Sequence, residues 1–186
     1  PMRCINDRFY TVDGQLPDEN KLKRTIYEEL SPWLHAKVAQ TVEQIIKALK
    51  LAAYTEPLTL QCDRIHVANG TCFLDGTFTE EKEYCGNRLP VSYRTDAPAP
   101  EHWLHFLSEL LEPEDIPALQ EYLGYCLIPS TKGQKMLMLI GKGGEGKSRI
   151  GVVMNAIFGL NMNTTSIQKV ENSRFARADL EGKLLM

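Results

Sequence analysis

The sequence feature that most constrains the fold is a glycine-rich stretch in the last third of the chain. It fits the pattern G-x-x-x-x-G-K-[ST] at every fixed position, and it reads Gly141, Lys142, Gly143, Gly144, Glu145, Gly146, Lys147, Ser148. Five apolar residues, 136–140, precede it and are typical of a strand buried on both faces. After it, apolar residues recur at the spacing of one helix face, at Ile150, Val153, Met154 and Ile157. A strand, a glycine-rich loop and a helix in this order predict a nucleotide-binding site.

Each residue type in this stretch has a physical role in holding phosphate. Glycines let the backbone pass close to a ligand, so that successive N–H groups and the helix N-terminus point at phosphate oxygens. Lys147 is expected to contact the β- and γ-phosphates, and the Ser148 hydroxyl is expected to ligate Mg²⁺. Arg149 is a further candidate for nucleotide binding, although a position on the helix surface is equally consistent with the sequence. The alternative interpretation of the stretch is a glycine-rich turn between two core elements.

Charge is distributed unevenly along the chain. The net charge of the chain is −3. Residues 1–131 contain 12 Lys and Arg and 20 Asp and Glu, whereas residues 132–186 contain 9 Lys and Arg and 4 Asp and Glu. The basic excess therefore lies with the glycine-rich stretch, where it suits a polyanionic ligand. No apolar run approaches the length of a membrane span and no signal peptide is evident, so a cytoplasmic protein is expected.

The rest of the pattern predicts a mixed α and β chain. Before the glycine-rich stretch, the expected elements are an irregular segment 1–17, a helix from Asp18 to Leu30, a helix 33–53 with Ser31 as N-cap, a β-hairpin turning at Asn69-Gly70 and two helices before Pro129. After it, we expect a helix that ends at Gly159, an irregular segment 160–171, a short helix from Ser173 to Gly182 and a second buried strand from Lys183. This order predicts an α+β to α/β fold. A helical and β-hairpin region, 1–131, precedes the first part of a P-loop ATPase domain, 132–186.

Nucleotide hydrolysis needs an acidic residue on a later strand to hold Mg²⁺, and an arginine to neutralise the developing charge. Leu184-Leu185-Met186 is placed to begin such a strand, and no acid follows it. Asp75 follows an apolar pair but lies upstream, so we interpret it as a turn aspartate. The sequence therefore resembles the front part of a larger enzyme.

Several other side chains are weaker candidates for chemistry. His102 and His105 could share a metal ion on one helix face, but surface histidines are the favoured interpretation. Arg174 and Arg177 could touch phosphate or DNA, against the favoured interpretation of solvated helix charges. Trp33 falls on a core stripe and predicts no base-stacking platform. The five cysteines include no C-x-x-C pair and predict reduced, mostly buried thiols, with a loosely spaced zinc site as the alternative, from Cys62, Cys72 and Cys85.

From about Ile65 onward, an ordered series of short pieces resembles the phage- and plasmid-type primase–helicases, superfamily 3 helicases related to the poxvirus primase–helicase. The pieces are Asn69-Gly70, residues 87–93 (NRLPVSY), residues 103–107 (WLHFL), Leu123-Gly124-Tyr125 with Leu127, the glycine-rich stretch, Gly159-Leu160-Asn161, and Arg174-Phe175 with Ala178, Leu180, Gly182 and Lys183. The series as a whole is more specific than the glycine-rich stretch alone.

The resemblance implies an ATP-driven DNA helicase that acts in the replication of a phage, plasmid or other mobile element. Such enzymes are hexameric rings of AAA+-type domains that bind ATP with Mg²⁺ between subunits and act on DNA. Only the residues of the glycine-rich stretch can be carried over from the family, because its magnesium acids, arginine finger and DNA-contacting loop would follow Met186. Another P-loop enzyme, such as a small-molecule kinase, and an inert assembly fragment remain the alternatives.

Overall fold

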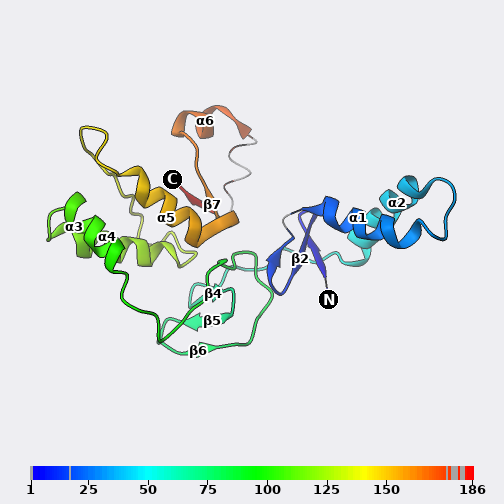
Figure 1. Cartoon of the computed structure of the whole chain (residues 1–186), viewed down its shortest axis with the longest axis horizontal. Coiled ribbons are helices and arrows are strands. Elements are labelled where there is room, and N and C mark those ends of the chain that lie inside the picture. The colour runs from blue at the N-terminus through cyan, green and yellow to red at the C-terminus, as the bar shows by residue number, and fades with distance from the viewer. Residues whose placement is uncertain (1, 17, 175, 177–179, 181–182) are drawn as a thin grey trace. The chain divides into compact units, whose positions relative to one another are not determined.

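A computed structural model describes residues 2–16, 18–174, 176, 180 and 183–186, and the chain has a mixed α+β architecture (Figure 1). It divides into two compact units. Unit 1 comprises Pro1–Thr59 with Glu83–Gly86, and unit 2 comprises Leu60–Lys82 with Asn87–Met186. The boundary expected at residue 131 therefore lies inside unit 2. Among the described residues, no helix has the length and apolar content that crossing a bilayer requires.

Unit 1 begins with a small antiparallel sheet in the order β1-β2-β3, formed by β1 (Arg3–Ile5), β2 (Arg8–Thr11) and β3 (Gly14–Gln15). Asn6 and Asp7 form the two-residue turn between β1 and β2, both with positive φ (48° and 63°), as a type I′ hairpin requires. The expectation of an irregular segment 1–17 is therefore wrong over the residues described. The strands are too short to show a clear alternation, and the Asn-Asp turn was the only local signal of the hairpin.

Two helices complete unit 1, α1 (Glu19–Leu30) and α2 (Val38–Ala52). The predicted start of α1 is confirmed, because the Asp18 carboxylate accepts a hydrogen bond from the Asn20 amide at 2.8 Å. Ile46 of α2 packs with Cys4 and Phe9 of the sheet to form the core. Backbone hydrogen bonds of Cys4 to Ala53 and Thr55 fasten β1 to the end of α2.

The predicted start of the second helix is wrong. Ser31 does not cap it, because its amide and hydroxyl both donate to the Tyr27 carbonyl (2.9 and 2.6 Å) and so close the end of α1. The chain then turns through Lys37, which has a φ of 58°, before α2 begins. Trp33 lies in this connection and is 81% exposed instead of lying on a core stripe.

Unit 2 starts with the predicted β-hairpin, which is confirmed. β4 (Arg64–Val67) pairs with β5 (Gly70–Phe73), and β6 (Phe78–Thr79) pairs with β5 on its other side. Val67 and Gly70 pair directly, so the two loop residues are Ala68 and Asn69, one position earlier than expected. Gly70 is required here because a Cβ at that position would overlap the Thr79 carbonyl oxygen of β6.

Three helices supply the main core of unit 2: α3 (Glu101–Leu110), α4 (Asp115–Cys126) and α5 (Ser148–Phe158). Their buried side chains form one cluster with two residues from outside the helices: Leu89, Leu107, Leu119, Ile150, Met154, Phe158 and Met162. The predicted helix stop at Gly159 is confirmed, and a 3-10 turn, η1 (Gly159–Asn161), follows.

The C-terminal part holds a short parallel pair, β7 (Met162–Asn163) with β8 (Leu184–Leu185), and α6 (Ile167–Asn172) lies between them in sequence. The strand expected from Lys183 is thus present, but Leu185 is 39% exposed. The irregular segment expected at 160–171 is wrong, because Ser166 caps α6 by accepting from the Lys169 amide at 3.2 Å. Ser173 follows the end of α6, and its hydroxyl accepts from the Ala176 amide at 3.3 Å, as the predicted N-cap of a next helix requires; Arg174 and Ala176 are helical. Phe175, residues 177–179 and residues 181–182, with most of the helix expected there, lie outside the described residues.

The strand predicted before the glycine-rich stretch is not formed. Residues 136–140 pair with no strand among those described, and Met136, Met138 and Ile140 are 72%, 65% and 87% exposed. Only Leu137 and Leu139 pack against the core cluster. A strand is buried on both faces only when it belongs to a sheet that other elements cover on both faces, and among the described residues the apolar run belongs to no such sheet.

Candidate phosphate-binding loop

The glycine-rich stretch forms a loop between the extended segment 136–140 and the first turn of α5. Gly143, Gly144 and Gly146 have φ values of 92°, 76° and 94°, a region that other residues adopt only with strain. Gly146 has a second constraint, since a Cβ there would lie 3.2 Å from the Phe106 ring of α3. The loop path therefore depends on glycine, as the sequence pattern predicts.

The backbone of the loop presents a row of hydrogen-bond donors. Intramolecular bonding resumes only at the Arg149 amide, which donates to the Gly146 carbonyl at 2.8 Å, and at the Ile150 amide, which donates to Lys147 at 3.1 Å. Within the described part of the chain, no group accepts a hydrogen bond from the amides of residues 143–148. These amides adjoin the N-terminus of α5, where the helix dipole also favours an anion.

Charged side chains of the loop contact one another. Glu145 Oε2 accepts from Lys147 Nζ at 2.6 Å, and Glu145 Oε1 accepts from the Lys142 amide at 3.2 Å. The Lys147 ammonium, and after it the Lys142 amide, hold the pKa of the Glu145 carboxyl below its usual value. A Cβ at Gly141 would overlap both the Glu145 carboxylate and the Lys147 ammonium, so this ion pair lies directly against the Gly141 backbone.

Three of the other loop residues singled out by the sequence are open to solvent, and Lys147 is half-buried. Lys142, Ser148 and Arg149 are exposed, and the Lys147 side chain is 23% exposed. Ser148 is the first residue of α5, so its hydroxyl lies at the helix N-terminus beside the loop amides. Glycines, lysine and serine thus lie together at one place, and this set can accommodate a phosphate group with its metal ion.

α5 is held in place by its buried face and by aromatic side chains of α3. Ile150 is 1% exposed, and Met154 and Phe158 are also buried. On α3, the rings of Trp103 and Phe106 stack with centroids 5.6 Å apart, and Phe106 faces Gly146. In the sequence these two aromatics appear only within the piece 103–107, and nothing in that pattern indicates that they support the loop.

The far end of α5 is tied to the hairpin by polar side chains. Asn161 Nδ2 donates to the Arg88 carbonyl at 2.8 Å, and the buried Arg88 guanidinium donates to the carbonyls of Val67 and Gly70 (2.6 and 3.0 Å). Asn69 makes two hydrogen bonds with the backbone of Tyr93. Through these bonds Arg88 and Asn161 link the hairpin to η1, which follows α5. In the sequence only the pieces that resemble the primase–helicases include these two residues.

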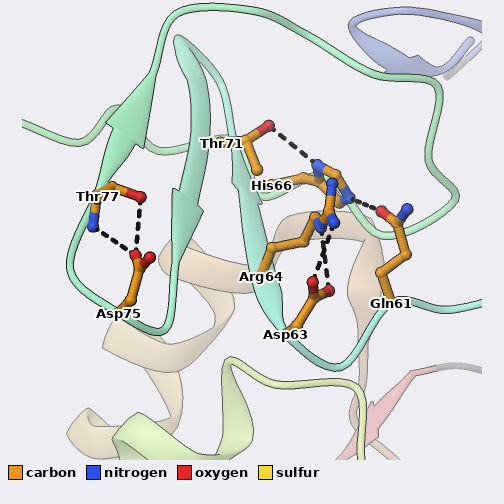
Figure 2. A network of polar contacts seen from close by, with 7 residues as sticks. All are labelled: Gln61, Asp63, Arg64, His66, Thr71, Asp75 and Thr77. Atoms are coloured by element: carbon orange, nitrogen blue, oxygen red, sulfur yellow. Dashed lines mark hydrogen bonds and ion pairs between the residues drawn. The ribbon is translucent and has the colours of Figure 1, made fainter.

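A polar network around the hairpin is satisfied internally (Figure 2). The buried His66 ring lies 3.3 Å from Thr71 Oγ1 and 3.1 Å from Gln61 Oε1, and Asp63 pairs with Arg64. Asp75 Oδ1 accepts from the amide and the hydroxyl of Thr77 (2.9 and 2.7 Å), and these bonds lower its pKa. The interpretation of Asp75 as a turn aspartate is therefore confirmed.

The remaining candidates do not assemble into a site. His102 and His105 are exposed on α3, and His105 lies 3.4 Å from Glu109 one turn away. Within the described ranges, no three His, Cys, Asp or Glu side chains are grouped to hold a metal ion. No disulfide joins the five cysteines, all of which lie among the described residues: Cys4 and Cys85 are buried, Cys72 and Cys126 half-buried, and Cys62 exposed. Arg174 is exposed, and Arg177 lies outside the described residues.

Comparison with known proteins leaves the loop as the main functional indication. No family model matches the chain, and no curated protein matches it. Three of the pieces that resemble the primase–helicases do meet in unit 2, since Asn69 contacts residues 87–93 and Asn161 contacts Arg88. The family assignment itself stays a prediction from the sequence.

Proposed function

We propose that this chain carries the ATP-binding loop of an ATP-dependent DNA helicase of the primase–helicase type. The observation that supports the proposal most strongly is the loop itself. Three glycines with positive φ lead into α5, and the amides of residues 143–148 have no acceptor among the described residues. Such a row of amides at a helix N-terminus, with a lysine beside it, suits the phosphates of a nucleotide.

The chain's own residues would bind and orient the ligand. The amides of residues 143–148 would hold the phosphate oxygens, the Lys147 ammonium would neutralise the β- and γ-phosphates, and the Ser148 hydroxyl would ligate Mg²⁺. The glycines would keep side chains away from the phosphates, and Phe106 would fix the exit of the loop through its contact at Gly146. Bound Mg-ATP would supply the phosphoanhydride bond whose cleavage drives unwinding.

The DNA substrate, a hexameric ring and action in the host cytoplasm follow from the sequence resemblance. The uneven charge also favours a polyanionic partner near the loop, because residues 132–186 carry the basic excess. Glu145 is the only acid within residues 132–170, and Lys147 already engages its carboxylate. We therefore expect nucleotide binding from residues 1–186 and hydrolysis only when further acids and an arginine reach the loop.

Titration with a fluorescent ATP analogue in the presence of Mg²⁺ tests this function. Lys147→Ala should weaken binding at least about tenfold, because it removes the cation that faces the phosphates. The matched control is Lys132→Ala, an exposed lysine outside the loop, which should leave the affinity unchanged. Binding that is equally strong in the two variants would contradict a phosphate site at this loop.

A further inference from the structure

Glu145 occupies one of the donors that the proposed function assigns to phosphate, the Lys147 ammonium. Its two carboxylate oxygens engage two separate groups of the loop, the Lys147 ammonium at 2.6 Å and the Lys142 amide at 3.2 Å. Its carboxylate also lies against Gly141, the first glycine of the stretch. The side chain therefore folds back into its own loop instead of extending into solvent.

A carboxylate and a phosphate compete for such donors because both present anionic oxygens to the same N–H groups. A nucleotide phosphate cannot contact Lys147 in full while Glu145 Oε2 accepts from the same ammonium. We propose that Glu145 is an intramolecular competitor of the nucleoside triphosphate, which must displace this carboxylate to bind. The proposal rests on the proposed function, and it adds a built-in contact that lowers the affinity of the free loop.

The surroundings allow the carboxylate to leave. The Glu145 side chain is 43% exposed, and its hydrogen-bond partners Lys142 and Lys147 both belong to the loop. A Cβ added at Gly143 or Gly144 would have no neighbouring atom within 4 Å, so there is open space beside the loop into which the Glu145 side chain can move. Displacement thus exchanges one partly exposed ion pair for a charge-assisted contact with phosphate and leaves the core of unit 2 untouched.

Three variants separate occupation of the donors from simple repulsion between negative charges. Glu145→Gln removes the charge, and Glu145→Asp keeps it but shortens the side chain by one methylene, so that it no longer spans both donors. Glu121→Gln is the matched control, because Glu121 is an exposed acid of α4 outside the loop. Each variant is titrated with a fluorescent ATP analogue and Mg²⁺, with circular dichroism to confirm folding.

The proposal expects Glu145→Gln and Glu145→Asp to bind the nucleotide about three- to tenfold more tightly than the unmodified chain, with Glu121→Gln unchanged. Unchanged or weaker binding by Glu145→Gln, or an aspartate variant equal to the unmodified chain, would overturn it. If the unmodified chain binds in a Lys147-dependent manner and the Glu145 variants do not differ, only this inference fails. If none of these proteins binds the nucleotide, the proposed function fails with it.

Discussion

Arg88 gives a direct test of how the hairpin is held in unit 2. Its Nη1 atom donates to the carbonyls of Val67 and Gly70, and the residue is only 7% exposed. Arg88→Met keeps a long side chain in the same space but removes both donors. A hydrogen bond to a charged group contributes about 1.5–3 kcal/mol, and the guanidinium no longer has to be desolvated, which offsets part of the loss. We therefore expect the free energy of unfolding of unit 2 to fall by about 2–4 kcal/mol.

Urea denaturation followed by tryptophan fluorescence can measure this loss in unit 2 alone. The chain has two tryptophans, Trp33 in unit 1 and Trp103 in unit 2, so Trp33→Phe leaves Trp103 as the reporter. Arg94→Met is the matched control, because Arg94 is 62% exposed and pairs only at the surface with Asp96. The control should unfold at nearly the same urea concentration as the parent chain. An Arg88→Met midpoint equal to that of the control would refute the reasoning.

Two further predictions concern glycine and pH. Gly146→Ala should weaken nucleotide binding and destabilise unit 2 by about 1–2 kcal/mol, because residue 146 has a positive φ. Gly124→Ala should instead stabilise unit 2 by about 0.5–1 kcal/mol, because Gly124 lies in α4 with open space at its Cβ position. Urea denaturation followed by Trp103 fluorescence distinguishes these opposite changes. In unit 1, hydrogen bonds from Lys50 and then Lys23 hold the pKa of Glu19 below its usual value. Because the folded pKa is lowered, the ionised Glu19 carboxylate adds to the free energy of unfolding at pH values above the ordinary glutamate pKa. This stabilisation is lost as the pH falls through the lower pKa of the folded protein. Thermal unfolding between pH 6 and 3 should show this loss, and Glu19→Gln should reduce it; an identical pH dependence in both proteins would count against the ion pairs.

Features fixed by local chemistry could be predicted from the sequence. The Asp18 cap, the helix stop at Gly159 and the hairpin near Asn69 each depend on residues within a few positions, and all are found. The glycine-rich stretch also forms a loop before a helix, as its pattern predicts. Ser31 was misassigned because a serine between two helices can close the first or begin the second, and sequence spacing does not distinguish the two.

Features that depend on distant partners could not be predicted. The apolar run 136–140 is typical of a buried strand, but a buried strand needs a sheet to pair with, and the described residues provide no strand next to this run. An arginine such as Arg88 is expected at the surface from sequence alone, because its two carbonyl partners, Val67 and Gly70, lie far away in the chain. Glu145 fills a variable position of the pattern, so nothing in the motif indicates that its carboxylate turns back onto Lys147.

The central claim is that the loop amides and Lys147 hold the phosphates of a nucleotide. Amide chemical shifts of the isotope-labelled chain, recorded with and without Mg-ATP, test it most directly because each loop glycine reports separately. We expect the amide signals of Gly143, Gly144 and Gly146 to shift on addition of Mg-ATP, and those of β4 and β5 to stay unchanged. Saturating Mg-ATP that leaves the loop amides unchanged, or that shifts only amides elsewhere, would contradict it.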